Sequence, residues 1–172
     1  EMAAAGVRIV GEIGISGVKD PEQAEPMVRW AQSHGMKVVM HTGGASIPGS
    51  GVIGADYVLA VRPDVAAHVN GGPTALRSPE VERILDESEA MIEVVHNGNA
   101  RAVGDVVRLA AERDALGRVI VGTDSPAGTG VVPLGILRTM GWMSALGGMA
   151  PELAVACATG NTAKLHGLDR GV

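Results

Sequence analysis

The sequence is poor in aromatic residues and in cysteine. Aromatic residues make up 2% of its 172 residues, with two Trp, one Tyr and no Phe, so the core must be built from Val, Ile, Leu, Met and Ala. The single cysteine, Cys157, excludes an internal disulfide framework and is typical of a reducing compartment. We therefore expect a cytoplasmic protein.

Long hydrophobic runs and excess basic charge are also missing. No apolar stretch reaches the roughly 18 residues that a membrane helix needs, so no membrane partner is expected. The formal net charge of -5 excludes a strongly basic nucleic-acid surface. Hydrophobic residues make up 46% of the chain, enough for the core of one domain of ordinary size. Because the sequence starts at Glu1 and not at Met, we expect a fragment that is cut at both ends.

Short apolar runs alternate with longer segments of helical character. The runs predict strands over residues 7–15, 36–41, 64–69, 91–95 and 118–122, and helices are predicted over 21–34, 55–60, 78–87, 100–114, 132–145, 151–158 and 161–165. The strands are continuous apolar runs, which indicates that both of their faces are buried. This pattern is typical of an α/β fold in which helices cover a parallel sheet.

Each predicted strand ends in or near a side chain that can bind a metal. Reading along the chain gives Glu12, His41, His68, His96 and Asp124. In parallel α/β folds these ends meet at one edge of the sheet. Two imidazoles and two carboxylates (Glu12, His41, His68 and Asp124) suit a divalent ion such as zinc, iron or manganese. Such an ion offsets the cost of burying charge and can activate water for hydrolysis.

Each of these residues also has a structural explanation. A buried strand histidine can bond a carbonyl group, Glu12 can form an ion pair, and Asp124 in "GTDSP" can be a turn or capping residue. His96 fits either a substrate pocket or a loop. The two other histidines, His34 and His166, precede glycines in the last turns of predicted helices, where the helix dipole favours them without any chemistry.

Other motifs in the sequence do not indicate a site. The stretch "GSGVIG" matches the dinucleotide fingerprint, but it does not follow a strand directly, so nucleotide binding is not expected. A G-x-S-x-G nucleophile motif does not occur. Cys157 lies in a helix of small residues and is expected to be a core residue.

The metal-ligand pattern resembles the amidohydrolase superfamily. The stretches "VGEIG", "MHTGGASIPGS", "HVNGGPTA" and "PAGTGVVPLGILR" are similar to a branch that hydrolyses cyclic enamides. The resemblance implies a partial (β/α)8 TIM barrel, in which residues 1–172 supply strands 4 to 8. The H-x-H motif of the family's first strand is missing, and a complete barrel needs about 250 residues. The half that carries the other ligand pair and the small β-sandwich domain are therefore expected outside this sequence.

The resemblance also implies a mechanism and the role of each residue. Glu12 bridges two metals (zinc, or a zinc and iron pair), since the lysines at 19, 37 and 164 do not end the first strand. His41 and His68 hold one metal. Asp124 helps to hold the other and transfers the proton while the C–N bond of a small cyclic amide is hydrolysed. The resemblance carries no role over to His96. From the positions of these residues in the sequence, we expect the substrate to lie near His96, Gly128 and Gly130.

Three readings stay open at this point. They are lactam hydrolysis, another reaction of the superfamily such as cyclic imide hydrolysis or deamination, and a half-barrel that has no activity by itself. The full-length protein is expected to be a homo-oligomer. A half-barrel should also expose apolar strands at both ends of its sheet, which favours aggregation or pairing with a second copy.

Overall fold

The protein alternates strands and helices as the sequence predicts. The computed structural model describes residues 1–14, 20–45, 48–71, 74–127 and 130–169. Its strands are β1 (Ile9–Ile13), β2 (Lys37–His41), β3 (Val65–Ala67), β4 (Met91–Val95) and β5 (Val119–Gly122). Its α-helices are α1 (Pro21–Ser33), α2 (Ala55–Val61), α3 (Ser78–Glu87), α4 (Ala100–Glu112), α5 (Gly135–Gly147), α6 (Pro151–Ala158) and α7 (Gly160–Leu165).

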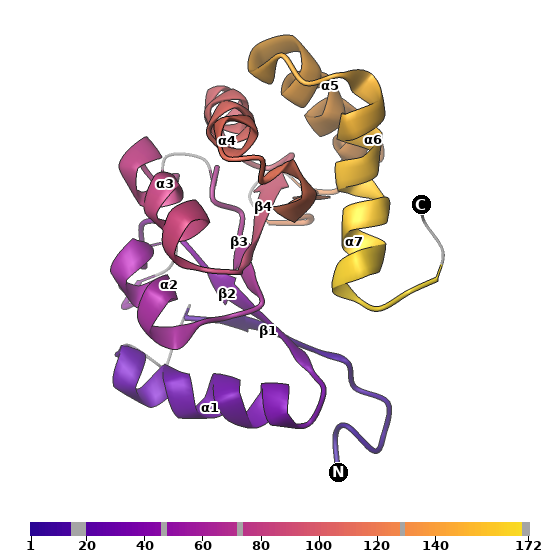
Figure 1. The fold of residues 1–172 in the computed structure, drawn as a ribbon. Coiled ribbons are helices and arrows are strands. Elements are labelled where there is room, and N and C mark those ends of the chain that lie inside the picture. Colours follow the sequence, from indigo (N-terminus) through magenta and orange to yellow (C-terminus); the bar gives the residue numbers. More distant parts are fainter. Residues whose placement is uncertain (15–19, 46–47, 72–73, 128–129, 170–172) are drawn as a thin grey trace.

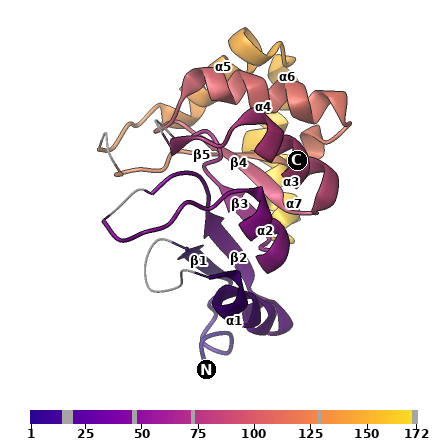
Figure 2. The same cartoon turned by 90° about the vertical axis from the view of Figure 1, so that its left-hand side faces the viewer.

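The five strands form one parallel sheet whose order follows the sequence from β1 to β5. Helices α1 to α4 pack against one another in chain order along one side of the sheet, and α5 to α7 gather around β5 (Figure 1). Figure 2 shows the same arrangement from the side. Each of the strands β1 to β4 is thus followed by a helix that returns the chain to the next parallel strand, which is how an arc of a (β/α) barrel is built.

The core lies between the sheet and this row of helices. Val38 and Met40 of β2 and Ile92 and Val94 of β4 are buried on the helix-facing side, and Ile84 of α3 packs into the same cluster. Methionine, isoleucine and valine are the largest fully buried side chains, as the shortage of aromatic residues predicts. The helices therefore cover one face of the sheet mainly with aliphatic side chains, and Tyr57 of α2 is the aromatic residue in the buried cluster of the described residues.

The other face of the sheet is only partly covered, so the prediction that both faces are buried is wrong for several positions. Lys37 and Val39 of β2 and Met91 and Glu93 of β4 are half-buried, while their neighbours on the helix side are buried. On β1, Ile9 is 46% exposed. The physical reason is that, in the described part of the chain, no further strand lies beside β1 to complete the curve of the sheet.

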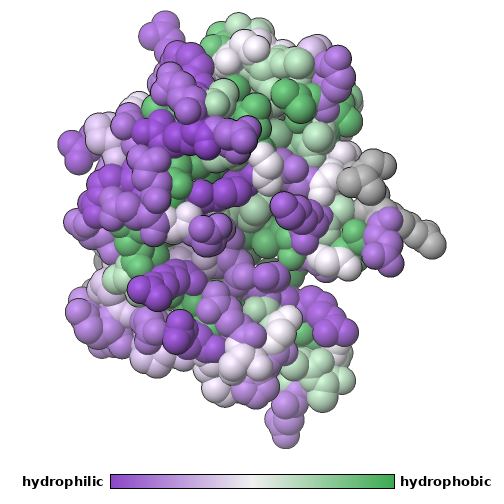
Figure 3. All heavy atoms as spheres, viewed as in Figure 1, coloured by the Kyte–Doolittle hydropathy of each residue, from purple (hydrophilic) through white to green (hydrophobic). Residues whose placement is uncertain are grey.

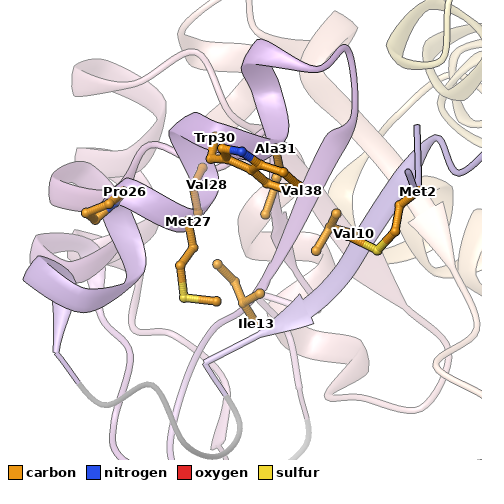
Figure 4. Close-up of a pocket in the computed structure, with 9 residues that line it drawn as sticks. All are labelled: Met2, Val10, Ile13, Pro26, Met27, Val28, Trp30, Ala31 and Val38. Carbon is orange, nitrogen blue, oxygen red and sulfur yellow. The ribbon is translucent and has the colours of Figure 1, made fainter. Parts of the chain in front are cut away.

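An apolar groove lies beside β1 and confirms the expected exposed strand at this end. Its volume is about 410 Å³, and Figure 4 shows Val10 and Ile13 of β1 facing Met27 and Trp30 of α1 across it. Met27 and Trp30 are both more than half exposed. None of the residues that line this groove carries a titratable side chain, so it is a packing surface and not a site of chemistry.

The opposite end of the sheet differs from that expectation. Val119 and Ile120 of β5 are buried, because α5, α6 and α7 pack against this strand. Asn161 of α7 donates through Nδ2 to the backbone oxygen of Val119 at 2.7 Å. Exposed hydrophobic residues at this end lie instead on the outer surface of α5 and α6 (Figure 3), and include Leu137, Leu146, Leu153 and Val155. None of the helices in the described part of the chain has the length and hydropathy to span a bilayer.

Candidate metal centre

Three of the four predicted ligands meet at one edge of the sheet. Glu12, His41 and His68 each offer a ligand atom, and these atoms all lie within 4.8 Å of one another. His41 Nδ1 lies 3.1 Å from Glu12 Oε1, and His68 Nε2 contacts the same oxygen. The centroids of the two imidazole rings are 4.7 Å apart. One carboxylate oxygen is therefore shared by two imidazoles.

Three neighbouring strands deliver these side chains (Figure 1). His41 is the last residue of β2, and His68 directly follows β3. Glu12 lies on β1 where the register shifts, because Val10 pairs with Val38 while Ile13 pairs with Met40. Such a bulge inserts one extra residue and re-aims the side chains beside it. Glu12 thus reaches the histidines from the interior of an otherwise apolar strand.

The three side chains are shielded from solvent to different degrees. The exposed fraction of the side chain is 4% for His41, 11% for His68 and 25% for Glu12. Ionised groups that are this buried need a partner of opposite charge or a cation. In the described part of the chain no lysine or arginine forms an ion pair with any of them, so they depend on one another.

The electrostatics of the cluster follow from this mutual dependence. Burial raises the pKa of Glu12, but hydrogen bonds to His41 and His68 and the charge of these imidazoles outweigh it and lower the pKa from 4.5 to about 2. Burial lowers the pKa of His68, yet its hydrogen bond to Glu12 and the negative charges of Glu12, Asp124 and Glu93 raise it above the ordinary value. The carboxylate of Glu12 is therefore stabilised by positive charge beside it, and a bound cation can supply that charge in place of the imidazoles.

Asp124 lies near this cluster but not in it. It follows β5 and adopts a left-handed backbone with a φ of 54°. Burial raises the pKa of its carboxyl group; the charge of His68 lowers it, that of Glu12 raises it and that of His41 lowers it. Asp124 is thus within electrostatic reach of all three residues, while the group of ligand atoms within 4.8 Å does not include it. The predicted convergence of four ligands is met by three.

His96 and Gly130, two of the residues predicted to bind the substrate, make their own contacts outside the cluster. The imidazole of His96 stacks on Trp142 of α5, with ring centroids 5.0 Å apart, and its buried Nδ1 has no hydrogen-bond partner among the described residues. The N–H of Gly130 donates to the backbone oxygen of Pro126 at 3.1 Å. Gly128 lies outside the described residues. Contact of these three positions with a substrate stays a prediction.

Sequence reasoning missed Glu93, which lies in the middle of β4. Its Oε2 accepts a hydrogen bond from the backbone N–H of His68 at 3.2 Å. Burial raises the pKa of Glu93, and the hydrogen bond from His68 lowers it again in part. The signal was available, because Glu93 interrupts the apolar run "MIEVV" just as Glu12 interrupts "VGEIG". A search limited to the carboxyl ends of the strands passes over it.

Asn70 was also missed, and it fixes the loop that carries His68. The residue is fully buried. Its Oδ1 accepts from the N–H of Val95 at 2.7 Å, and its Nδ2 donates to the backbone oxygen of Val95 at 2.9 Å. The amide group therefore bonds the end of β4 much as a further residue of β3 does. No sequence motif marks an asparagine for this role.

Comparison with known proteins places this geometry in context. No family model matches the chain. Over all of its 172 residues the chain is 52% identical to the enamidase of Eubacterium barkeri and covers 45% of that protein. The crystal structure of enamidase, described as a new member of the amidohydrolase superfamily, superimposes with a TM-score of 0.94 and covers 99% of this chain and 44% of the other. The predicted resemblance is thereby confirmed.

A second solved structure agrees in fold. The β-aspartyl dipeptidase of Fervidobacterium islandicum AW-1, solved in complex with a β-Asp-Leu dipeptide, superimposes with a TM-score of 0.64 at 17% identity. It covers 94% of this chain and 48% of that protein. The chain thus matches the C-terminal part of an amidohydrolase TIM barrel and spans less than half the length of the relatives.

Proposed function

We propose, on the basis of this match to part of an amidohydrolase barrel, that the protein is a metal-dependent hydrolase of the C–N bond in a cyclic amide. The observation that carries the proposal is the cluster of Glu12, His41 and His68, in which two imidazole nitrogens and a carboxylate oxygen lie within 4.8 Å. The similarity to enamidase over the whole chain supports the hydrolase class.

The donor atoms of the cluster fit a divalent ion. Imidazole nitrogens and carboxylate oxygens are ligands that zinc and iron both accept. His41 and His68 are held with their ring nitrogens toward a single oxygen of Glu12, so a cation placed among them replaces the protons that now hold the group together. When bound, such an ion acts as a Lewis acid and makes water nucleophilic near neutral pH.

The residues of this chain have separate roles in the proposed reaction. Glu12 neutralises positive charge at the centre, and His41 and His68 fix its position from two neighbouring strands. Asp124, at the carboxyl end of β5, accepts the proton of the attacking water and donates it to the leaving nitrogen of the amide. Because the inner face of the sheet is only half-buried, we infer that a small substrate can reach the residues at this edge. Zinc, or zinc together with iron, is the proposed metal.

The test is the metal content of the protein expressed from its complete gene. His41→Asn and His68→Asn should each weaken the binding of zinc at this cluster by at least tenfold and so lower the zinc content, because each removes one of its three donors. His34→Asn is the matched control, since His34 lies at the exposed end of α1 and bonds the backbone oxygen of Trp30 at 2.8 Å. Zinc content that is unchanged in both site variants would refute the metal centre.

The substrate class needs its own measurement. When the protein is assayed against a panel of cyclic amides, cyclic imides and aryl amines, we expect turnover of a six-membered lactam. Mass spectrometry detects the ring-opened product. Turnover confined to imides, or release of ammonia from aryl amines alone, would replace the proposed reaction with another one. Zinc binding without turnover of any of these compounds would leave the protein as a binding module and refute the hydrolase.

A further inference from the structure

Glu93 carries a half-buried carboxylate on β4. It lies on the inner face of β4, and in the described part of the chain neither lysine nor arginine forms an ion pair with it. Burying a carboxylate costs free energy unless hydrogen bonds or charge offset it. The hydrogen bond that its side chain accepts comes from the backbone N–H of His68, at 3.2 Å. The carboxylate of Glu93 is therefore tied by a hydrogen bond to one residue of the proposed metal centre.

His68 has a backbone conformation that needs such support. Its φ is 35°, in the left-handed region that residues with a side chain rarely adopt and that costs about 1–2 kcal/mol. Glu93 holds this segment twice, because its side chain bonds the N–H of His68 and its backbone oxygen bonds the N–H of Val69 at 3.0 Å. With the backbone fixed in this way, Nε2 of His68 points to Glu12.

Gly122 of β5 makes room for the Glu93 carboxylate. A Cβ at position 122 would clash with Glu93 Oε1 and would lie 3.1 Å from its Cδ. The glycine has no special backbone conformation that would otherwise explain it, since Gly122 is not among the residues with positive φ. Gly122 and Glu93 thus lie side by side on neighbouring strands, and the carboxylate that fills the space above Gly122 accepts the hydrogen bond from the backbone of His68.

We propose that Glu93 is a positioning residue that sets the geometry of the metal centre: its carboxylate holds the backbone of His68 in the left-handed conformation, and Gly122 leaves the space for it. The inference rests on the proposed metal site and adds the residue that orients one of its ligands. Glu93 does not contact the cation or the substrate; it acts through His68.

The chain offers a matched pair for the control. Glu80 of α3 accepts from the backbone N–H of Arg77 at 3.2 Å, and a Cβ at Gly54 would clash with its Oε1. This pair repeats the carboxylate, the backbone N–H and the glycine, and Glu80 is not among the residues of the cluster. Glu80→Ala and Gly54→Ala are therefore compared with Glu93→Ala and Gly122→Ala in the protein expressed from its complete gene.

The first measurement is the zinc dissociation constant, obtained by competition with a chelator, with the unfolding midpoint recorded alongside. Glu93→Ala and Gly122→Ala should weaken zinc binding about 10- to 100-fold, the range typical of residues behind a ligand. Glu93→Gln should stay within about threefold, because its amide oxygen still accepts the hydrogen bond. The two control variants should bind zinc as the wild type does. Gly122→Ala keeps the carboxylate of Glu93 and only displaces it, so this variant still tests the proposal if Glu93→Ala does not fold.

The second measurement is amide hydrogen exchange at His68 in the metal-free protein. Exchange should be at least tenfold faster in Glu93→Ala than in the wild type and unchanged in Glu93→Gln. If the wild type binds no zinc, the metal centre is refuted while this exchange still decides the role of Glu93. Normal zinc affinity in Glu93→Ala would overturn the proposal. An equal loss in Glu93→Gln and Glu93→Ala would also overturn it, since charge and not position would then be the cause.

Discussion

The contact between Glu12 and the two histidines should make the stability of the metal-free protein depend on pH in a specific way. The perturbation is Glu12→Gln, which removes the charge of the carboxylate and keeps its size. In the structure this carboxylate has a pKa of about 2 instead of 4.5 because His41 and His68 bond it and carry positive charge, in opposition to its burial. Folding therefore stabilises the ionised form of Glu12 relative to its neutral form.

The pKa gives the magnitude. A fall from 4.5 to about 2 corresponds to about 3 kcal/mol of favourable interaction between the carboxylate and its surroundings. The Glu12 side chain is 25% exposed, and water screens part of that interaction. We expect Glu12→Gln to lower the free energy of unfolding by about 1–2 kcal/mol where both partners are charged.

The direction of the pH dependence follows from the two pKa shifts. Since folding lowers the pKa of Glu12, its contribution is present above pH 4.5 and is lost as the pH falls toward 2. Since folding raises the pKa of His68, its contribution is present below pH 6.5 and is lost as the pH rises through the raised value. Both shifts describe one contact, so the difference between wild type and variant should be largest between pH 4.5 and 6.5.

Urea unfolding of chelator-treated protein across this pH range measures the effect, with Glu80→Gln as the control. Glu80 is a carboxylate of α3 whose neighbour in the structure is Arg77 and not a histidine. A difference between wild type and Glu12→Gln that stays constant from acidic to alkaline pH would refute the reasoning. So would a difference near zero between pH 4.5 and 6.5.

Two further predictions concern single side chains around the cluster. Asp124→Asn should lower the turnover of a cyclic amide at least 100-fold in a steady-state assay while zinc stays bound at Glu12, His41 and His68, because the variant cannot transfer the proton; loss of that zinc would contradict the proposed role. Asn70→Ala should lower the free energy of unfolding by about 1–3 kcal/mol, because it leaves the N–H and the oxygen of Val95 without their partner. Its measurement is urea unfolding, and a change below about 0.5 kcal/mol would contradict the bonding role of Asn70.

The sequence allowed most of the fold to be predicted because each element carries its own local signal. Helix α1 begins at Pro21 as predicted, because proline suits the first position of a helix, and it ends at Ser33, one residue before the predicted end. Strand β4 has the predicted bounds, Met91 to Val95. Helix α3 also has the predicted bounds, Ser78 to Glu87, and Glu80 of its first turn accepts a hydrogen bond from the N–H of Arg77.

The candidate site was predicted in part, for a physical reason. Glu12, His41 and His68 lie at or near strand ends, where the topology of a parallel sheet brings them together whatever the loops do. Asp124 lies two residues beyond its strand with a positive φ, and its distance from the others depends on how the loop turns. Glu93 reaches the site along a strand and not from its end. Its role depends on a backbone N–H that no sequence pattern encodes.

The bulged strand β1 has one further consequence. In the described part of the chain this strand pairs with β2, and it carries the carboxylate that both imidazoles share. A cation held by all three residues links β1 to β2 and β3, so binding of the ion and packing of β1 favour each other reciprocally. Loss of the ion should therefore loosen the contact among these three strands before it loosens the layer of helices.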